Sequence, residues 1–458
     1  MMEVADYYVE YYEELDKRLE CFISDWGTDY EVKLDKHNVT EALKTFLFYR
    51  LSMERDYYNQ CRLKGISIDE AMERVDAFLK MFNEESSGEN QEEKFADIKA
   101  HPWYELLSEY KGVLIVYLFN ARQLQYLTPL LLKLNHPVLL LSEYDIPEET
   151  ELPEYVTALP IEFSNKNTLT DKEFKLHFPL VFHYANTFDI LFQIIQPCGV
   201  ICLEGCHFQE QLLAVVAESY DIPSYGLQQG WPSMMRTGFR RLPFRYFFTW
   251  GEQFSSLWAK YNPFPMFVPT GYMYEIAGEV NGEKQCVSFF LQSPCFLSDR
   301  IYFDAMLELI SDSANTFPEV TFLVREHPEY RLEELIVEKW KELDNVEVVS
   351  DCRLQDVYVR AKIVVSHFSS SLMEGMLYGC IPLIYDPTAN SRYYPDIEKE
   401  GLGRISKSTE EFQTCLKELL TGRKQPMLFD KKDQWFTSTG DVTLRSMVAF
   451  LKDTWRNE

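Results

Sequence analysis

The stretch VLIVYLFNARQLQYLTPLLLKLNHPVLLLS, Val113–Ser142, carries two kinds of hydrophobic pattern. Val113–Phe119 and Pro137–Ser142 are short, continuous apolar runs, and between them ARQLQYLTPLLLKL has apolar residues at helical spacing. This order predicts a strand, a helix and a strand. Fully apolar strands that alternate with helices are typical of a parallel sheet covered on both faces. The stretch therefore predicts an α/β fold.

The same alternation recurs along most of the chain. It predicts two Rossmann-like domains, because one series of strands ends near residue 230 and a second begins near residue 286. The strands expected in the first series after Val113–Ser142 are PLVFHYA (Pro179–Ala185), GVICLEG (Gly199–Gly205) and SYGLQQG (Ser224–Gly230). The main strands of the second series are CVSFFLQS (Cys286–Ser293), VTFLVREHP (Val320–Pro328), KIVVSHFSSS (Lys362–Ser371) and IPLIYD (Ile381–Asp386).

The length of 458 residues is too great for one ordinary core, so several domains are expected. Residues 1–100 are predicted to form a helical N-terminal extension, because their apolar residues recur at three- and four-residue spacing. Residues 101–272 are assigned to an N-terminal Rossmann-like domain on the acceptor side. Residues 273–458 are assigned to a C-terminal Rossmann-like domain on the nucleotide-sugar side, with the last helix packing back on the first domain.

Composition excludes some classes of function. Acidic residues outnumber basic ones by 72 to 45, and the resulting net charge of −27 disfavours nucleic acid as a partner. The first twenty residues are acidic and amphipathic, unlike a secretory signal. No apolar run approaches the length of a membrane span. The sequence therefore predicts a cytoplasmic protein.

Ligands of open α/β sheets bind at the carboxyl ends of the strands, and two facing domains would leave a cleft there. Neither a dinucleotide fingerprint nor a P-loop is present, so the candidates are the residues that follow the predicted strands. Glu204, before Gly205, is the first candidate because a carboxylate at a strand end can take a proton from an acceptor hydroxyl. The alternative is that Glu204 caps the helix beginning near Gln209.

Gln229, Gly230 and Trp231 follow the next predicted strand, where the glycine allows close approach to a ligand. The alternative is a turn with a packed tryptophan. Arg236 and Arg240 belong to a basic cluster just beyond, which also includes Arg241 and Arg245. Forked guanidinium groups suit a carboxylate or phosphate, and a solvated surface is the alternative.

Two segments of the second domain complete the candidates. His327 and Pro328 end one predicted strand, although a histidine before proline is also a plain strand end. Ser369, Ser370 and Ser371 end another, before a helix that carries Glu374. Hydroxyls and free amides at a helix N-terminus form a phosphate site, and ordinary serine capping is the alternative.

A metal or cofactor is not expected. Cys198, Cys202 and Cys206 recur every fourth residue, but they straddle a predicted strand and its end, where this spacing does not converge as it does on a helix. Buried free thiols are the favoured interpretation, which fits a reducing compartment.

An acid before glycine in the first domain, His-Pro in the second and a later serine cluster have an ordered counterpart in a known family. The chain resembles the bacterial GT-B transferases that use CMP-activated acidic sugars, namely the polysialyltransferases and the Kdo transferases of capsule and lipopolysaccharide. LQQGWPS (227–233), FFTWGEQF (247–254) and FVPTGY (267–272) look most like the β-Kdo transferases. The resemblance covers roughly residues 110–390.

The resemblance implies a GT-B-type pair of Rossmann-like domains and roles for the candidates. Glu204 would be the catalytic base, His327 and Pro328 would contact CMP, and the serine cluster would hold its phosphate. One position departs from the family, which carries two acids before the glycine where this chain has Leu203 and Glu204.

The implied activity is transfer of an acidic sugar, Kdo above all, from a CMP-sugar donor to a surface polysaccharide or glycolipid acceptor. Lipid-linked acceptors would allow peripheral association with the inner face of the membrane. The alternatives are a CDP-glycerol or UDP-sugar transferase, a nucleotide-sugar epimerase of the same fold, and a non-catalytic scaffold that docks through its N-terminal helices.

Overall fold

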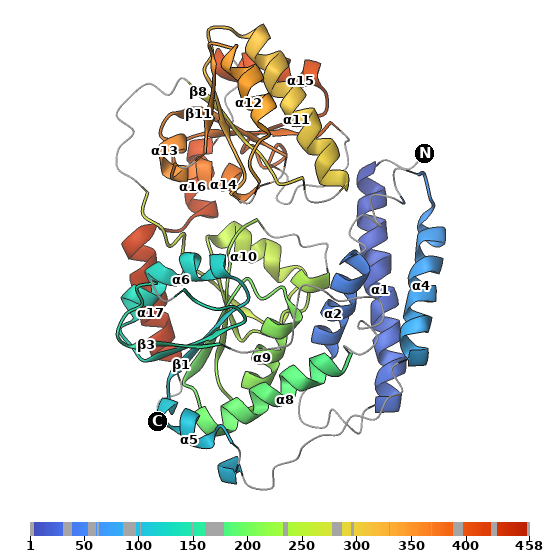
Figure 1. The fold of residues 1–458 in the computed structure, drawn as a ribbon, viewed down its shortest axis with the longest axis vertical. Helices are drawn as coiled ribbons and strands as arrows, with labels where there is room; N and C mark the ends of the chain where they lie inside the picture. The colour runs from blue at the N-terminus through green and yellow to red at the C-terminus, as the bar shows by residue number, and fades with distance from the viewer. Residues whose placement is uncertain are drawn as a thin grey trace. The chain divides into compact units, whose positions relative to one another are not determined.

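The computed structural model divides the chain into two compact units (Figure 1). The first domain consists of Tyr12–Met53, Ile66–Tyr274 and Phe436–Glu458, and the second of Glu275–Trp435 with Met1–Tyr11 and Glu54–Gly65. The structure describes residues 4–30, 39–53, 61, 64–85, 98–100, 102–147, 150–160, 178–231, 237–276, 286–294, 297–328, 330–350, 352–367, 369–387, 397–422 and 428–455.

The first domain is built on seven parallel strands in the order β3-β2-β1-β4-β5-β6-β7. The strands are β1 (Leu114–Leu118), β2 (Val138–Ser142), β3 (Val156–Pro160), β4 (Gly199–Leu203), β5 (Ser224–Leu227), β6 (Tyr246–Thr249) and β7 (Met266–Pro269). Every residue of β1, β2, β4 and β5 is buried. Burial on both faces explains why these strands are continuous apolar runs.

Helices cover the two faces of this sheet, with α6 and α17 on one face and α8 and α9 on the other (Figure 1). Leu451 of α17 is fully buried in the same hydrophobic cluster as Leu134 of α6, so the C-terminal helix is part of this core. The elements are η2 (Ile98–Ala100), α5 (Tyr104–Leu107), η3 (Ser108–Tyr110), α6 (Ala121–Leu134), α8 (Phe178–Ile195), α9 (Phe208–Ser219), η4 (Thr237–Phe239), α10 (Glu252–Ala259) and α17 (Gly440–Thr454).

One predicted strand of the first domain is wrong. The segment PLVFHYA, 179–185, lies in the first half of α8. Val181, Tyr184, Ala185 and Phe188 are among the buried residues of this helix, and their spacing of three, four and seven positions is that of one helical face. A short apolar run does not distinguish a strand from a buried helix.

The N-terminal helices pack on the first domain. They are α1 (Val4–Tyr30), α2 (Thr40–Met53) and α4 (Ile68–Glu85). Helix α2 lies against α8, α9 and η4, and its buried Leu43, Phe46 and Leu47 form an apolar stripe at helical spacing. Residues 12–53 thus share a unit with the strands of the first sheet.

The second domain is built on six parallel strands in the order β10-β9-β8-β11-β12-β13. The strands are β8 (Cys286–Phe290), β9 (Phe322–Arg325), β10 (Val346–Val349), β11 (Ala361–Ser366), β12 (Ile381–Tyr385) and β13 (Arg404–Ser406). The helices are α11 (Leu297–Thr316), α12 (Glu334–Lys341), α13 (Leu354–Tyr358), α14 (Ser370–Leu377), α15 (Thr409–Leu420) and α16 (Leu428–Trp435).

Both sheets reverse their strand order once. The reversal lies between β1 and β4 in the first sheet and between β8 and β11 in the second. The connections that leave the two strands at such a point run in opposite directions across the sheet. This leaves a crevice at the carboxyl ends of the two strands. The prediction of two Rossmann-like domains with N-terminal helices is confirmed. Among the described residues, no helix is both long and apolar enough to cross a membrane.

Candidate functional site

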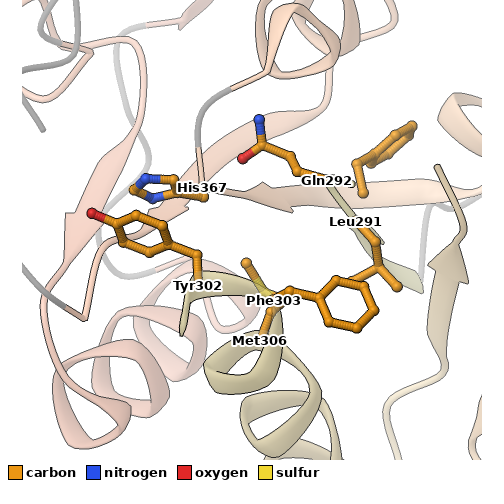
Figure 2. A pocket seen from close by; sticks show the side chains of 7 residues that line it. Leu291, Gln292, Tyr302, Phe303, Met306 and His367 are labelled. Carbon is orange, nitrogen blue, oxygen red and sulfur yellow. The ribbon is translucent and has the colours of Figure 1, made fainter. Parts of the chain in front are cut away.

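A pocket lies at the switch point of the second sheet (Figure 2). It is formed by the end of β8, the first turns of α11 and the residue after β11. The side chains that line it are mainly apolar, and Gln292, Tyr302 and His367 carry its polar groups. The lining residues are Phe290, Leu291, Gln292, Tyr302, Phe303, Met306 and His367. Sequence reasoning placed His367 in a candidate segment but did not assign it to the site. It missed Gln292, which follows β8, and Tyr302, which lies in α11.

The predicted serine cluster follows the same strand, β11. Ser369 is the N-cap of α14, and its Oγ accepts a hydrogen bond from the backbone N–H of Ser371 over 3.3 Å. Ser371 Oγ lies 2.8 Å from the same oxygen, and Glu374 is buried in the next turn. Serine capping is therefore present. A phosphate would use the same helix N-terminus, whose amides and positive dipole end attract anions.

The predicted His-Pro element follows β9 and forms a tight turn. His327 pairs with Tyr330 in an isolated antiparallel bridge, and the backbone N–H of Tyr330 donates to the carbonyl oxygen of His327 over 3.0 Å. Glu326 closes the loop by accepting from the N–H of Leu332 at 2.7 Å and from Arg331 at 3.0 Å. Burial opposes ionisation of Glu326, but hydrogen bonds from Ser350, Leu332 and Arg331 outweigh it and lower its pKa. The turn leaves Pro328 exposed and His327 half-buried.

Glu204 lies at the switch point of the first sheet, directly after β4. Its φ of 66° and the φ of 71° at Gly205 turn the chain out of the strand. Its carboxylate accepts a hydrogen bond from the backbone N–H of Gly230, but burial has the larger effect and raises the pKa of Glu204 to about 7. The structure thus brings predicted residues from the ends of β4 and β5 together.

The loop after β5 is held in place by Gln228. Its side chain donates to the carbonyl oxygen of Gly230 over 3.0 Å and accepts from the backbone N–H of Trp250 over 2.9 Å. Gln229 and Trp231 are half-buried on either side of the buried Gly230. The loop therefore holds the backbone N–H of Gly230 beside the Glu204 carboxylate.

Glu204 does not cap α9, because Glu210 has that role. The Glu210 Oε2 accepts from the backbone N–H of His207, the N-cap residue, over 3.2 Å. The other carboxylate oxygen accepts from Gln123 Nε2 over 3.2 Å. Burial, with a smaller contribution from Glu204, raises the pKa of Glu210 to about 8. The capping alternative for Glu204 is excluded by this arrangement.

An N-terminal helix also contributes to this region, which the sequence did not predict. The ring of Tyr49, in α2, stacks on His207 with centroids 5.2 Å apart. Phe119, which follows β1, stacks on His207 with centroids 4.3 Å apart. The histidine next to the candidate base is therefore held by aromatic rings from two other elements. The partners lie 158 and 88 positions away in the sequence, beyond any local pattern.

The cysteine spacing does not produce a three-thiol site. Cys198 Sγ contacts His136, Cys202 Sγ contacts the backbone of Glu210, and Cys206 Sγ lies 4.0 Å from Glu204. In the described part of the chain, Cys206, His207 and Glu210 bring possible metal-ligand atoms within 4.8 Å of one another. They sit at the N-terminus of α9, where the helix dipole disfavours a cation.

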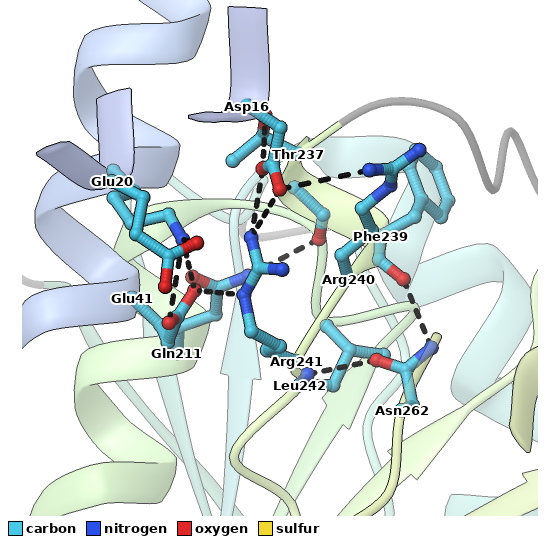
Figure 3. Close-up of polar contacts among 12 residues, drawn as sticks. Asp16, Glu20, Glu41, Gln211, Thr237, Phe239, Arg240, Arg241, Leu242 and Asn262 are labelled. Atoms are coloured by element: carbon cyan, nitrogen blue, oxygen red, sulfur yellow. Dashed lines mark hydrogen bonds and ion pairs between the residues drawn. The ribbon is translucent and has the colours of Figure 1, made fainter. Parts of the chain in front are cut away.

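The described members of the predicted basic cluster lie beside acids of the same chain, and Figure 3 shows two of them, Arg240 and Arg241. Arg241 donates to both Asp16 oxygens over 2.7 Å and to Glu41 over 2.9 Å. Arg240 is buried, 3.6 Å from Asp16 and over the Tyr261 ring. These arginines therefore hold α1 and α2 on the first domain and do not form a solvated surface. The substrate contact of Arg240 stays a prediction.

Arg245, another member of that cluster, lies apart from this contact. Arg245 pairs with Glu218 at 3.0 Å and with Asp221 at 2.8 Å. Arg236, predicted to bind substrate, lies outside the described residues.

No family model and no curated protein sequence matches this chain. Solved structures do. The glycosyltransferase of kitacinnamycin has 13% sequence identity and a TM-score of 0.51, over 76% of this chain and 99% of that one. A UDP-GlcNAc 2-epimerase from Neisseria meningitidis, bound to UDP-GlcNAc, has 11% identity and a TM-score of 0.48, over 74% and 99%. The strand orders and the first of these likenesses define a GT-B-type fold.

Proposed function

We propose that this protein is a glycosyltransferase that binds a nucleotide-activated sugar on the second domain and activates an acceptor hydroxyl on the first. The observation that supports the proposal is that candidate site residues follow the strands at the switch point of each sheet. A pocket and a serine-capped helix follow β8 and β11 in the second domain. Glu204, whose pKa burial raises to about 7, follows β4 in the first.

On the second domain, the phosphate of the donor would lie at the N-terminus of α14. The hydroxyls of Ser369, Ser370 and Ser371 and the first amides of the helix would bind it. Glu374, one turn further on, would support this end of the helix. The turn of His327 and Pro328 would contact the nucleotide and stabilise the leaving group.

On the first domain, Glu204 would act as the general base. It would take the proton of an acceptor hydroxyl while the acceptor oxygen bonds to the anomeric carbon of the sugar. The bond between that carbon and the phosphate oxygen would break, and the nucleoside monophosphate would leave with the electron pair. Gln229, Gly230 and Trp231, on the loop that donates to Glu204, would contact the substrate.

The donor is proposed from the sequence resemblance. The order of Glu204, the His-Pro turn and the serine cluster supports a CMP-activated acidic sugar, with Kdo first among them. The acceptor would be a saccharide or a lipid-linked saccharide in surface-polysaccharide or lipopolysaccharide assembly. The enzyme would then work in the cytoplasm, with peripheral contact to the inner face of the membrane.

Titration of the protein with CMP, CDP, UDP and GDP, followed by calorimetry and thermal shift, tests the donor. A ligand at one hundred times its Kd stabilises a fold by about 2.7 kcal/mol, which either method detects. We expect selective binding of CMP, and loss of that binding in His327→Ala. Preference for UDP would instead support a UDP-sugar transferase, or an epimerase that releases free sugar and UDP without acceptor. Absence of binding would favour a scaffold.

Glu204→Gln tests the base once CMP-sugar transfer is measured. The substitution keeps the shape and removes the proton acceptor, so we expect kcat to fall by about one hundredfold or more. Glu218→Gln, on the exposed side of α9, is the matched control and should keep full activity. Full activity of Glu204→Gln would refute the assignment.

A further inference from the structure

Arg325 is a half-buried cation that the proposed mechanism does not use. It is the last residue of β9, at the carboxyl edge of the second sheet. Its Nη1 donates to the carbonyl oxygen of Cys352 over 2.8 Å and lies 3.4 Å from the sulfur of the same residue. A carbonyl and a thiol cannot neutralise a guanidinium. In the described part of the chain, no carboxylate forms an ion pair with Arg325.

An arginine without an acid is an exception in this chain, where acidic residues outnumber basic ones by 72 to 45. Each of the other described arginines of this domain pairs with a carboxylate: Arg300, Arg331, Arg353, Arg360 and Arg404. Glu326, next to Arg325 in the sequence, instead accepts from Arg331 and from the N–H of Leu332. Because arginine stays charged at every physiological pH, Arg325 suits an anion that the chain itself does not supply.

Arg325 also lies at the edge of the sheet where a ligand is expected. It pairs with Phe290 in β8, one of the two strands at the switch point, and its carbonyl oxygen accepts from the N–H of Leu291 over 3.0 Å. His327, on the turn proposed to contact the nucleotide, follows two residues later. Ligands of open α/β sheets bind at the carboxyl ends of the strands. The unpaired cation is therefore on the side of the sheet that is proposed to bind the donor.

We propose that Arg325 binds an anionic oxygen group of the sugar-nucleotide donor. The proposal rests on the proposed function, which assigns the donor to this domain. The contact with Cys352 holds the guanidinium by Nη1, and its Nε and Nη2 have no hydrogen-bond partner among the described residues. These two nitrogens form a fork that matches the paired oxygens of a phosphate or a carboxylate. A CMP-activated acidic sugar carries both groups, and the ligands of the experiment below distinguish them.

Two substitutions separate anion binding from support of the turn after β10. Arg325→Gln removes the charge and keeps an N–H that can donate to Cys352, whereas Arg325→Lys keeps the charge and loses the fork. A merely structural arginine would change the urea midpoint and leave ligand affinity unaltered. Arg360→Gln is the matched control, because Arg360 directly precedes β11 at the amino edge of the same sheet and pairs with Glu347 over 2.9 Å.

The experiment measures Kd for CMP and cytidine by calorimetry and KM for CMP-Kdo by initial rates, with the full-length protein and each variant. If the phosphate is the partner, we expect Arg325→Gln to weaken CMP binding by about tenfold to one-hundredfold and to leave cytidine unaffected. If the sugar carboxylate is the partner, CMP binding stays unaltered and KM for CMP-Kdo rises by a similar factor. Arg325→Lys should show a smaller loss of the same kind, and Arg360→Gln none.

Unaltered Kd and KM in folded Arg325→Gln would overturn the proposal and leave the proposed function standing. If Arg325→Gln does not fold, unaltered values in Arg325→Lys would overturn it equally. If the unsubstituted protein neither binds CMP nor uses CMP-Kdo, the proposed function itself fails.

Discussion

Glu204 combines two properties that a general base needs. It lies at a strand end, where substrates of α/β sheets bind, and burial places its pKa at about 7. A base is most effective when its pKa lies near the working pH, because it is then ionised and still basic. The neighbouring titratable groups are Cys206 and Glu210, and burial raises the pKa of both.

Activity should therefore depend on the ionisation of Glu204. Because its pKa is raised, the carboxyl group is protonated and inactive below about pH 7 and becomes a base above it. We expect kcat/KM for transfer to rise with pH, with a midpoint near 7, and then to level off. Initial rates over a pH series measure this. Glu204→Gln should lack the rising limb, and a flat profile in the unsubstituted protein would contradict the role.

Gly205, next to Glu204, makes a prediction about stability. Its φ is 71°, and a Cβ on this residue would come within 2.1 Å of the Phe244 ring. Gly65 has a φ of 67° with no atom within 4 Å of such a Cβ. Gly65→Ala should cost about 1 kcal/mol for backbone strain alone, and Gly205→Ala about 3 kcal/mol or more because it adds a clash. Urea unfolding measures both, and equal costs would contradict the packing.

At the scale of elements, the buried carboxylate of Asp16 joins α1 to the first domain. The Asp16 side chain is 7% exposed and receives Arg241 at 2.7 Å and the Thr237 hydroxyl at 3.0 Å. Burial raises the pKa of Asp16, but these partners outweigh it and lower the pKa overall. The pair therefore stabilises the fold above the ordinary pKa of an aspartate and is lost as the pH falls below it.

Removing this buried charge should loosen the contact between α1 and the domain. Asp16→Asn removes the buried charge beside Arg240 and Arg241, although Arg241 keeps its pair with Glu41. A broken buried pair costs about 3–5 kcal/mol. Asp221 is 84% exposed in its pair with Arg245, so Asp221→Asn should cost at most about 1 kcal/mol. Denaturant midpoints of both variants measure the difference. Similar midpoints would indicate that the Asp16 contact carries little stability.

The sequence predicts features that depend on neighbouring residues, and it does not predict contacts between residues that are far apart in the chain. The strands β4 and β11 were predictable because each is a continuous apolar run of local origin, although the predicted segments ran on to Gly205 and Ser371 and the strands end at Leu203 and Ser366. The partner of Arg241 was not, because Asp16 lies 225 positions away. Nothing periodic in the sequence joins the two residues. A separation of 158 positions likewise hid the contact of Tyr49 with His207.

The whole molecule carries a net charge of −27, while its proposed donor is an anion. The described basic cluster does not offset this, because its arginines bind acids of the same chain. The long-range field should then repel a nucleotide until it comes close to the helix N-terminus that binds it. The attraction at the binding site acts over a short distance and the repulsion by the net charge over a long one. Salt therefore weakens the repulsion more than the attraction.

The rate of CMP association should therefore increase with ionic strength. The screening length falls from about 30 Å at 0.01 M salt to about 8 Å at 0.15 M, which removes most of the repulsion but little of the short-range attraction. We expect the association rate constant for CMP, measured by stopped flow, to rise severalfold over this range. Cytidine lacks the phosphate, so its association rate should stay constant and serves as the matched control. A CMP rate that falls with salt would instead mean that a local positive field guides the nucleotide, and the arginines would have to be released from their acids to provide it.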